Sequence, residues 1–496
     1  MPERYDVVVV GSGNAGFCAA HAAREYAKHV LIVEKAPRAW AGGNSYFTAG
    51  ATRTTFNALD DLRPILDDLT DVQAADVVLP PYTPEEFMAD MIRITEGRCD
   101  RALAGILVND AAAVVRWMHA KGIRWKLMYE RQSFTVDGKA HFFGNLPLGT
   151  VGEGKGLIAQ HTAAALASGI AIRYDAPVVG LLRDARGAVT GVAVNSTEGR
   201  AEIAARAVVL ASGGFEADPM RRAAYLGPNW DVAKVRGTPY NTGEVLQLAL
   251  NAGAQPYGHW SGCHAIQWDA GAPPTGDREI AHLFSKQSYP VGIVINRNAV
   301  RFLDEGADFR NYTYAKYGAE ILKQPGAIAW QLFDAKTAPL LRQDEYTAPG
   351  VSRYEAATIR DLAAHLGLDP DALDETVSAF NAAIQPGDFN PAIKDGVRTV
   401  AITPPKSNWA LPLDTPPFLA FAVTCGITFT FGGVKIDSDA RVLDRADRPI
   451  PGLHAAGELV GGLFYSNYPG GSGLTSGAVF GRHAGTSAGQ FASAHG

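Results

Sequence analysis

An apolar strand that leads directly into the glycine pattern G-x-G-x-x-G constrains this chain more than any other feature. The strand is YDVVVV (residues 5–10), the pattern is GSGNAG (residues 11–16), and the small residues 17–23 then favour a helix. A second apolar run, residues 30–33, ends at the acidic residue Glu34. A strand, a glycine turn, a helix and a second strand ending in an acid are typical of a dinucleotide-binding βαβ unit. An ordinary glycine-rich turn is the alternative interpretation.

Each position of the pattern has a physical purpose in such a unit. Gly11 makes the tight turn, Gly13 lets the backbone approach a pyrophosphate, and Gly16 lets the helix pack closely on the strand. The N-terminus of the helix offers unpaired N–H groups to the phosphates. Glu34 is placed to accept hydrogen bonds from ribose hydroxyls, and an acid there argues against a 2′-phosphate.

Small polar residues farther along the chain indicate which dinucleotide is bound. The run GGNS at 42–45 and the run TAG at 48–50 suit a backbone that follows a pyrophosphate toward an isoalloxazine ring. The buried strand AVVLASGG (207–214) ends in small residues, and the C-terminal segments AAGE (455–458) and GGSGL (470–474) place a second helix N-terminus after a glycine-rich loop. A helix dipole aimed at the flavin would stabilise the negative charge of its reduced form. These features together predict FAD.

The residues expected to contact FAD come from both ends of the chain. They are Gly11, Gly13, Asn14, Ala15, Gly16, Glu34, Lys35, Gly42, Gly43, Asn44, Ser45, Thr48, Ala49, Gly50, Ala211, Ser212, Gly213, Gly243, Glu244, Gly457, Glu458, Ser472, Gly473 and Leu474.

Composition excludes several classes of function. The 496 residues are 47% apolar and 19% charged, and the net charge of −6 gives no electrostatic basis for binding nucleic acid. The four cysteines are scattered without metal-ligand spacing, so we expect reduced thiols and neither a metal nor an iron–sulfur cluster in this chain. We find no targeting segment and no apolar run long enough to insert into a membrane, which favours the cytoplasm.

The order of the patterns predicts an α/β fold with a discontinuous, Rossmann-like FAD-binding domain and an inserted α+β capping domain. The predicted limits are 1–255 and 426–496 for the FAD-binding domain and 256–425 for the cap. Within the first segment we expect amphipathic helices near 84–96 and 100–120, a mobile loop over 139–156, and a meander of short strands over 170–195. Helices are expected again at about 353–384. A cap that closes over the flavin would deliver substrate-binding groups and exclude water.

The chain resembles the flavoprotein family of fumarate reductases and succinate dehydrogenases, which also includes 3-ketosteroid Δ1-dehydrogenases. The matching segments follow the family order over nearly the whole chain. They are VVVVGSGNAG, EKAPRAWAGGNSYFTAGA, AVVLASGGFEAD, NTGEV (241–245), NRNAVRFLDE and PGLHAAGELVGG with its glycine-rich end. The runs ADFRNYTYAKYG and GLFYSNYPGGSGL look most like FAD-dependent tricarballylate dehydrogenases. The histidine that links flavin covalently in the respiratory complexes has no counterpart in GNSY (43–46), so the resemblance implies non-covalent FAD.

The resemblance also implies a set of residues that act on the substrate. Arg310 occupies the place of the family's proton-transfer arginine, one residue farther from the R-F-x-x-E run. Because an arginine pKa lies above about 12, it acts as a base through a neighbouring carboxylate or otherwise binds a carboxylate bidentately. A surface ion pair with Asp308 or Glu305 is the structural alternative. Tyr312 or Tyr314 is the rival base.

Three further positions bear on the substrate. His264 falls where the family places a substrate-binding histidine, although a purely structural histidine is equally consistent. The histidine and the arginine that bind the distal carboxylate of fumarate are absent, and Tyr468 stands in the place of that arginine. Fumarate and succinate are therefore not expected as substrates. The same Tyr468 matches the tyrosine that polarises the ketone in ketosteroid dehydrogenases. Against that alternative, the region 260–320 carries several basic residues among its aromatics and so favours a compact, charged substrate; they are His264, His282, Lys286, Arg301 and Arg310.

The sequence thus predicts a flavoenzyme that oxidises a C–C bond of a small polycarboxylate, with tricarballylate to cis-aconitate as the specific hypothesis. A base removes a proton while a hydride passes to the flavin. The resemblance implies a separate, membrane-associated iron–sulfur protein that accepts the electrons. A 3-ketosteroid Δ1-dehydrogenase and a redox module for cofactor (cobalamin) biosynthesis are the alternatives.

Overall fold

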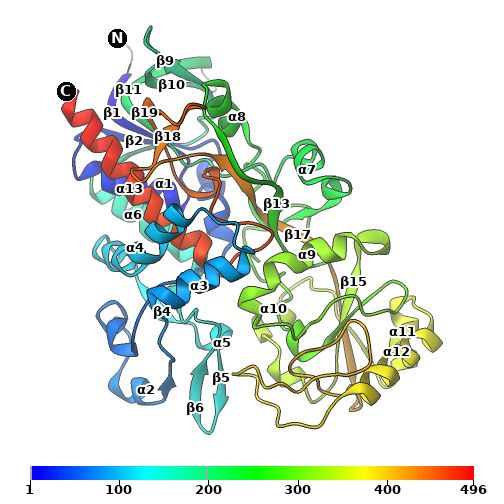
Figure 1. Cartoon of the computed structure of the whole chain (residues 1–496). Helices are drawn as coiled ribbons and strands as arrows, with labels where there is room; N and C mark the ends of the chain where they lie inside the picture. Colours follow the sequence, from blue (N-terminus) through cyan, green and yellow to red (C-terminus); the bar gives the residue numbers. More distant parts are fainter. Residues whose placement is uncertain (1–2, 197–198, 496) are drawn as a thin grey trace.

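Two β-sheets organise the chain, and the long strands β13 (Pro256–Asp269) and β17 (Phe418–Val434) run between the two halves of the molecule (Figure 1). The computed structural model describes residues 3–196 and 199–495. Across these residues no helix combines the length and the apolar character that a membrane crossing requires. The side chains of Cys18, Cys99, Cys263 and Cys425 are buried and unpaired.

The first sheet has eight strands, with the order β18-β19-β11-β1-β2-β8 and with β10 and β9 added on β11. Its bounds are β1 Glu3–Val10, β2 Val30–Val33, β8 Ala171–Arg173, β9 Val178–Arg183, β10 Val189–Ser196, β11 Gly199–Leu210, β18 Arg441–Leu443 and β19 Pro449–Ala455. The central strands pair in parallel, and Val8 lies between Val208 and Leu31. Because helices cover both faces of a parallel sheet, its strands are continuous apolar runs, as in Val7–Val10 and Val30–Val33.

Nine helices accompany the first sheet or the segments inserted in it. They are α1 Asn14–Arg24, α2 Asp71–Ala75, α3 Pro84–Ile94, α4 Arg101–Ala120, α5 Tyr129–Gln132, α6 Glu153–Ala167, α7 Pro219–Leu226, α8 Glu244–Asn251 and α13 Ser472–Ala494. The two amphipathic helices expected near 84–96 and 100–120 are confirmed as α3 and α4, and each begins after a side-chain cap, Thr83 and Asp100 respectively. The short strands expected over 170–195 are present as β8, β9 and β10. The antiparallel meander is formed by β9, β10 and β11, whereas β8 pairs in parallel with β2 at the other edge of the sheet.

The helices at the two ends of the chain pack directly against each other. In Figure 1, α13 crosses the blue N-terminal elements, and both termini lie at the same end of the molecule. Along α13, Gly481, Gly485 and Gly489 face the backbone of α1; a Cβ on Gly485 would lie 2.0 Å from the carbonyl oxygen of Ala19. The glycine spacing of four residues keeps one side of α13 bare. This close contact fixes the start of α13 beside the start of α1.

The second sheet has six strands. Its bounds are β12 Lys234–Val235, β13 Pro256–Asp269, β14 Ile293–Asn296, β15 Ala329–Phe333, β16 Tyr354–Ala356 and β17 Phe418–Val434. Its helices are α9 Tyr314–Leu322, α10 Gln343–Tyr346, α11 Ile359–Leu366 and α12 Pro370–Ala383. Helices α11 and α12 match the expectation for 353–384, whereas α9 was not anticipated. The domain limits 1–255, 256–425 and 426–496 stay a prediction.

The expectation of a mobile loop over 139–156 is wrong. That stretch contains β6 (Lys139–Phe142), β7 (Leu148–Thr150) and the first turn of α6, and β6 pairs with β5 (Ser133–Val136) and β3 (Val77–Val78) while β7 pairs with β4 (Trp125–Leu127). Its glycines serve close packing: a Cβ on Gly154 would lie 2.3 Å from the carbonyl oxygen of Ser45. The glycine content that suggested mobility instead lets α6 support the loop at 42–50.

The contact between α1 and α13 can be tested with two glycine-to-alanine changes of equal helix propensity. Gly105→Ala lies in α4 with no neighbouring atom within 4 Å of the new Cβ, so it should be neutral or stabilise by up to about 1 kcal/mol. Gly485→Ala gains the same propensity but forces the helices apart, and should destabilise by about 1–3 kcal/mol. Chemical unfolding of both variants measures the difference; equal effects would contradict close packing.

Buried neutral histidines make stability depend on pH. Five histidines are at most 3% exposed, namely His21, His161, His264, His282 and His454. Burial lowers the pKa of His454 to about 4, whereas the unfolded chain takes up a proton near pH 6.5. Stability from this residue is therefore present above about pH 6.5 and is lost as the pH falls to about 4, a total of about 3 kcal/mol.

The test compares urea unfolding of the wild type and of His454→Gln at pH 7.5 and pH 5. Glutamine keeps a hydrogen-bonding group toward the hydroxyl of Ser487, which lies 3.1 Å from Nε2 of His454. We expect the variant to lose less stability on acidification than the wild type. An identical loss in both proteins would show that His454 titrates normally in the folded state.

Candidate active site

A large cavity lies where the carboxyl ends of β1, β2 and β11 meet the N-termini of α1 and α13. It has a volume of about 1980 Å³ including the part open to solvent, and it extends into the second half of the molecule. Most of the residues proposed to contact FAD line it, namely Gly11, Gly13, Asn14, Ala15, Glu34, Lys35, Gly43, Asn44, Ser45, Thr48, Ala49, Ala211, Ser212, Gly213, Gly243, Glu244, Gly457, Glu458, Gly473 and Leu474.

Four of the residues proposed to contact FAD lie behind the cavity wall, where they contribute to packing; they are Gly16, Gly42, Gly50 and Ser472. A Cβ on Gly16 would lie 2.0 Å from the carbonyl oxygen of Gly11, so α1 touches the turn that precedes it. A Cβ on Gly50 would lie 2.2 Å from Oγ1 of Thr150. Gly16 thus provides the close helix–strand packing that the sequence predicted for it.

The two helix N-termini at the cavity could hold the phosphates of a dinucleotide. Gly13 precedes α1 and Gly471 precedes α13, so neither N-cap residue has a side chain that could occupy the N–H groups of its helix. On the first turn of α1 the N–H of Asn14 donates to the hydroxyl of Ser45 at 3.0 Å. Asn14 links the two helices, because its side chain donates to the carbonyl oxygen of Leu474 at 2.9 Å. The remaining N–H groups of the two first turns and the positive ends of the two helix dipoles favour an anionic ligand at this place.

Glu34 is held rigidly at the end of β2. One carboxylate oxygen accepts from the backbone N–H and the hydroxyl of Ser12 at 2.9 and 2.6 Å, and the other accepts from the N–H of Ala36 at 2.8 Å. A carboxylate has about four acceptor positions, so it could still accept from a ribose hydroxyl. Nearby, Lys35 forms an ion pair of 2.9 Å with Glu244.

A pair of buried carboxyl groups, Glu216 and Glu458, lies beside the loop that carries Asn44. Glu216 accepts from the side-chain amides of Asn44 and Asn241 at 2.7 Å each, and Glu458 accepts from the N–H of Thr430 at 2.7 Å. Burial, and then the neighbouring Glu458, raise the pKa of Glu216 well above its usual value. The pair therefore retains a proton. Sequence reasoning missed Glu216, because a glutamate after Gly-Gly-Phe carries no recognisable pattern.

The end of the cavity away from the glycine turn contains His264, Tyr314, Tyr468 and Phe429. The tyrosine hydroxyls are 2.5 Å apart, and the imidazole contacts both tyrosine rings edge-on with centroid distances of 5.0 and 4.7 Å. Neither ring nitrogen of His264 has a hydrogen-bond partner. Burial, followed by the nearby positive charge of Arg236, lowers the pKa of His264 well below its usual value, so the ring is neutral. Burial raises the pKa of both tyrosines.

Arg310 also lines this end of the cavity, from a short 3₁₀ turn, Arg310–Tyr312. Its guanidinium contacts the amide oxygen of Gln132 at 3.3 Å and lies over the ring of Phe143. The alternative of an ion pair with Glu305 or Asp308 is not realised, since Glu305 pairs with Arg301, and Asp308 with Arg93 and Lys394. Among the described residues no carboxylate lies within ion-pair distance of Arg310.

Tyr312 is not part of the cavity, although the sequence placed it among the candidate bases. Its hydroxyl donates to Asp90 at 2.7 Å and accepts from Arg53 and Asn145. Burial and then Asp90, opposed by Arg53, raise its pKa to about 12. Because residues 310–312 form a 3₁₀ turn, Arg310 and Tyr312 point in different directions. Tyr312 thus belongs to a structural network, and Tyr314 is the tyrosine that reaches the cavity.

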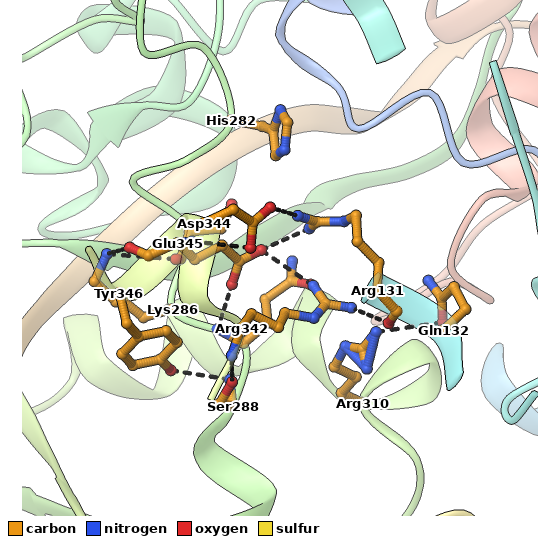
Figure 2. A network of polar contacts seen from close by, with 12 residues as sticks. Arg131, Gln132, His282, Lys286, Ser288, Arg310, Arg342, Asp344, Glu345 and Tyr346 are labelled. Carbon is orange, nitrogen blue, oxygen red and sulfur yellow. Dashed lines mark hydrogen bonds and ion pairs between the residues drawn. The ribbon is translucent and has the colours of Figure 1, made fainter. Parts of the chain in front are cut away.

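Behind Arg310 lies a network of compensated charges (Figure 2). Glu345 is fully buried and accepts from Arg131 at 2.6 Å and from Arg342 at 3.1 Å. Burial would raise the pKa of Glu345, but the positive charges of Arg131 and Arg342 outweigh it and hold the pKa below its usual value. Arg131 also pairs with Asp344 at 3.1 Å. Arg131 lines the cavity, but its charge is already neutralised, in contrast to that of Arg310.

Comparison with known proteins places the chain in a family. A family model described as an FAD binding domain matches residues 6–474. The probable fumarate reductase Ifc3 of Shewanella frigidimarina is 30% identical over 495 residues, which cover 99% of this chain and 76% of that protein. The chain belongs to the FAD-dependent fumarate reductase and succinate dehydrogenase flavoprotein family.

Two solved structures agree with this assignment. The open conformation of a flavocytochrome c3 fumarate reductase has a TM-score of 0.73 at 28% identity, covering 99% of this chain and 79% of that chain. A 3-ketosteroid Δ1-dehydrogenase from Sterolibacterium denitrificans has a TM-score of 0.73 at 21% identity, covering 98% of this chain and 100% of that chain, and shows the same fold. The flavoprotein is thus an FAD-dependent oxidoreductase, and the helix N-termini that follow Gly13 and Gly471 fit the phosphates of that cofactor.

Removing the carboxylate of Glu34 tests its assignment to the cofactor. Glu34→Ala loses a charged acceptor, and each hydrogen bond to a charged group contributes about 1.5–3 kcal/mol, so FAD affinity should fall by about 10- to 150-fold. Ser12→Ala, which removes a hydroxyl that donates to the same carboxylate, is the control, and its affinity for FAD should fall less. The dissociation constant follows from the fluorescence of released flavin. Unchanged FAD affinity in Glu34→Ala would show that the carboxylate stabilises the protein without contacting the cofactor.

Proposed function

We propose that the flavoprotein transfers hydrogen between FAD and a C–C bond of a small polycarboxylate, acting as a dehydrogenase. The observation that carries this proposal is the buried guanidinium of Arg310, which has no countercharge among the described residues and lines the cavity that contains the dinucleotide-binding loops. A buried charge without a partner is costly, and a carboxylate bound bidentately offsets that cost. The family relatives named as fumarate reductases agree with chemistry at a C–C bond beside a carboxylate.

In this proposal Arg310 binds the substrate and does not remove its proton. A guanidinium becomes a base only through a carboxylate that takes the proton onward, and its polar contact in the described structure is the neutral amide of Gln132. Arg310 therefore orients a carboxylate, which positions the adjacent carbon. When bound, FAD supplies the acceptor for the hydride.

His264 is the group best suited to accept the proton. The raised pKa of Tyr314 keeps its hydroxyl protonated at neutral pH, whereas His264 is neutral and has a free ring nitrogen. Its lowered pKa makes His264 a weak base when only protein groups surround it, and a substrate carboxylate beside it would raise that pKa. The hydroxyl pair of Tyr314 and Tyr468 can then donate a hydrogen bond to the substrate.

Tricarballylate, oxidised to cis-aconitate, is the specific substrate that we propose. Its three carboxylates suit a cavity with more than one cationic or donor group, and the segments around Arg310 and Tyr468 resemble those of tricarballylate dehydrogenases. The electrons would leave through a separate, membrane-associated iron–sulfur protein, and the cytoplasm remains the proposed location.

A 3-ketosteroid Δ1-dehydrogenase is the second candidate, because the hydroxyl pair of Tyr314 and Tyr468 could polarise a ketone. The guanidinium of Arg310 argues against it. An apolar steroid in the same cavity would leave that buried charge without a countercharge. Desolvation of the guanidinium, which costs on the order of several kcal/mol, would then oppose binding of the steroid.

Anaerobic mixing of the holoprotein with tricarballylate, succinate or a 3-ketosteroid distinguishes these functions, with the oxidised-flavin absorbance as the readout. We expect bleaching by tricarballylate alone. Bleaching only by the steroid would establish the second candidate. No bleaching by any of the three would favour an untested acid or a redox module without a substrate of its own.

Arg310→Gln should then lower kcat/KM for tricarballylate by about 100-fold, because the neutral amide loses one or two charge-assisted hydrogen bonds of about 1.5–3 kcal/mol each. FAD content should stay at the wild-type level. Tyr312→Phe serves as the control, because Tyr312 lies outside the cavity. The folded fraction of this variant should retain turnover of tricarballylate. A normal kcat/KM in Arg310→Gln would refute the assignment of Arg310 to the substrate.

A further inference from the structure

We propose that Arg236 forms a second anion subsite in this cavity and binds a carboxylate of the substrate that Arg310 does not hold. The inference rests on the proposed function and deepens it, since it identifies what recognises a substrate with more than one carboxylate. Arg236 lies just after β12, whereas Arg310 belongs to a separate 3₁₀ turn, and both residues line the cavity.

The guanidinium of Arg236 is buried without a countercharge. Its side chain is part of a residue only 6% exposed, and Nη1 donates to the hydroxyl of Thr428 at 3.3 Å while Nε has no partner. Within the described residues no carboxylate lies at ion-pair distance from it. Burial lowers the pKa of Arg236, as expected for a cation deprived of water.

Apart from Arg310, the other buried arginines among the described residues are satisfied by carboxylates or by several hydrogen bonds. Arg131 and Arg342 pair with Glu345, and Arg301 pairs with Glu305. Arg222 donates to the backbone carbonyls of Glu216, Trp230, Asp231 and Ala233. These structural guanidiniums are thus paired with carboxylates or bonded to several carbonyl oxygens. The guanidinium of Arg236, at the cavity wall, has neither kind of compensation.

The backbone holds Arg236 in place independently of any ligand. Val235 pairs with Ile427 on β17, and the N–H of Arg236 donates to the carbonyl oxygen of Ile427 at 2.8 Å. The next residue, Gly237, approaches Asn44 so closely that a Cβ would lie 2.1 Å from its amide oxygen. The guanidinium is thus preorganised beside the cofactor loop, and orienting it costs little when an anion arrives.

The groups around Arg236 match a carboxylate. Thr428 offers a hydroxyl, and the neutral imidazole of His264 has one ring N–H to donate and one nitrogen to accept. Tyr314 and Tyr468 close the same space. A planar anion with two oxygens would pair with the guanidinium fork and neutralise the charge that the protein leaves uncompensated.

The test titrates the holoprotein with tricarballylate, succinate and butyrate and follows the perturbation of the flavin spectrum. In the wild type the acids with several carboxylates should bind more tightly than butyrate. Arg236→Gln should weaken the binding of tricarballylate and succinate by about 10- to 150-fold and the binding of butyrate by less. The preference for acids with several carboxylates over butyrate should therefore be lost. Arg236→Lys should recover part of the affinity. Arg445→Gln, a change of an exposed arginine, is the charge-matched control and should leave all affinities unchanged.

Retention of the preference in Arg236→Gln would overturn the subsite. If none of the three acids perturbs the wild-type flavin, the proposed function fails, and inorganic sulfate then tests Arg236 separately. A sulfate-dependent rise in melting temperature that is present in the wild type and lost in Arg236→Gln would support an anion site for another ligand. An equal rise in both proteins would overturn it.

Discussion

The direct contact between α1 and α13 is the constraint on which the rest of the structure depends. These helices come from opposite ends of the chain, and their glycine and alanine faces meet without intervening side chains. The contact sets both helix N-termini on one cavity, and the bond from Asn14 to Leu474 fixes their register. A dinucleotide pocket built from segments that are distant in sequence needs such a fixed contact, because a shift of one helix would separate the positive ends of the two helix dipoles.

Charge compensation divides the cavity into a scaffold and a binding surface. Arg131 and Arg342 both pair with Glu345, and removing Glu345 would leave the buried guanidinium of Arg342 without a countercharge. Arg236 and Arg310 face the cavity without that compensation. The arginines paired with carboxylates hold the wall in shape. The two without a countercharge contribute a positive potential to the cavity, although the whole chain carries a net charge of −6.

The cofactor half of the site could be predicted because its determinants are local. Gly11, Gly16 and Glu34 sit within one βαβ unit, so their spacing in sequence fixes their spacing in the fold. The substrate half could not be predicted in the same way. Arg236 reaches the cavity because β12 pairs with β17, about 190 residues later in the chain, and Gln132 reaches Arg310 from an equally distant segment. Sequence analysis also took the glycines of 139–156 as a sign of mobility, whereas Gly154 provides tight packing.

The neutral state of His264 and the uncompensated charge of Arg236 are two consequences of one arrangement. Proximity to Arg236 and burial both oppose a proton on the imidazole. A carboxylate that binds Arg236 removes the first of these effects and replaces it with an attractive negative charge, so the basicity of His264 rises only when an anion is present. Proton acceptance is then coupled to substrate binding. An uncharged ligand in the same cavity would find His264 a weak base, and selectivity for anions would appear in the chemical step as well as in affinity.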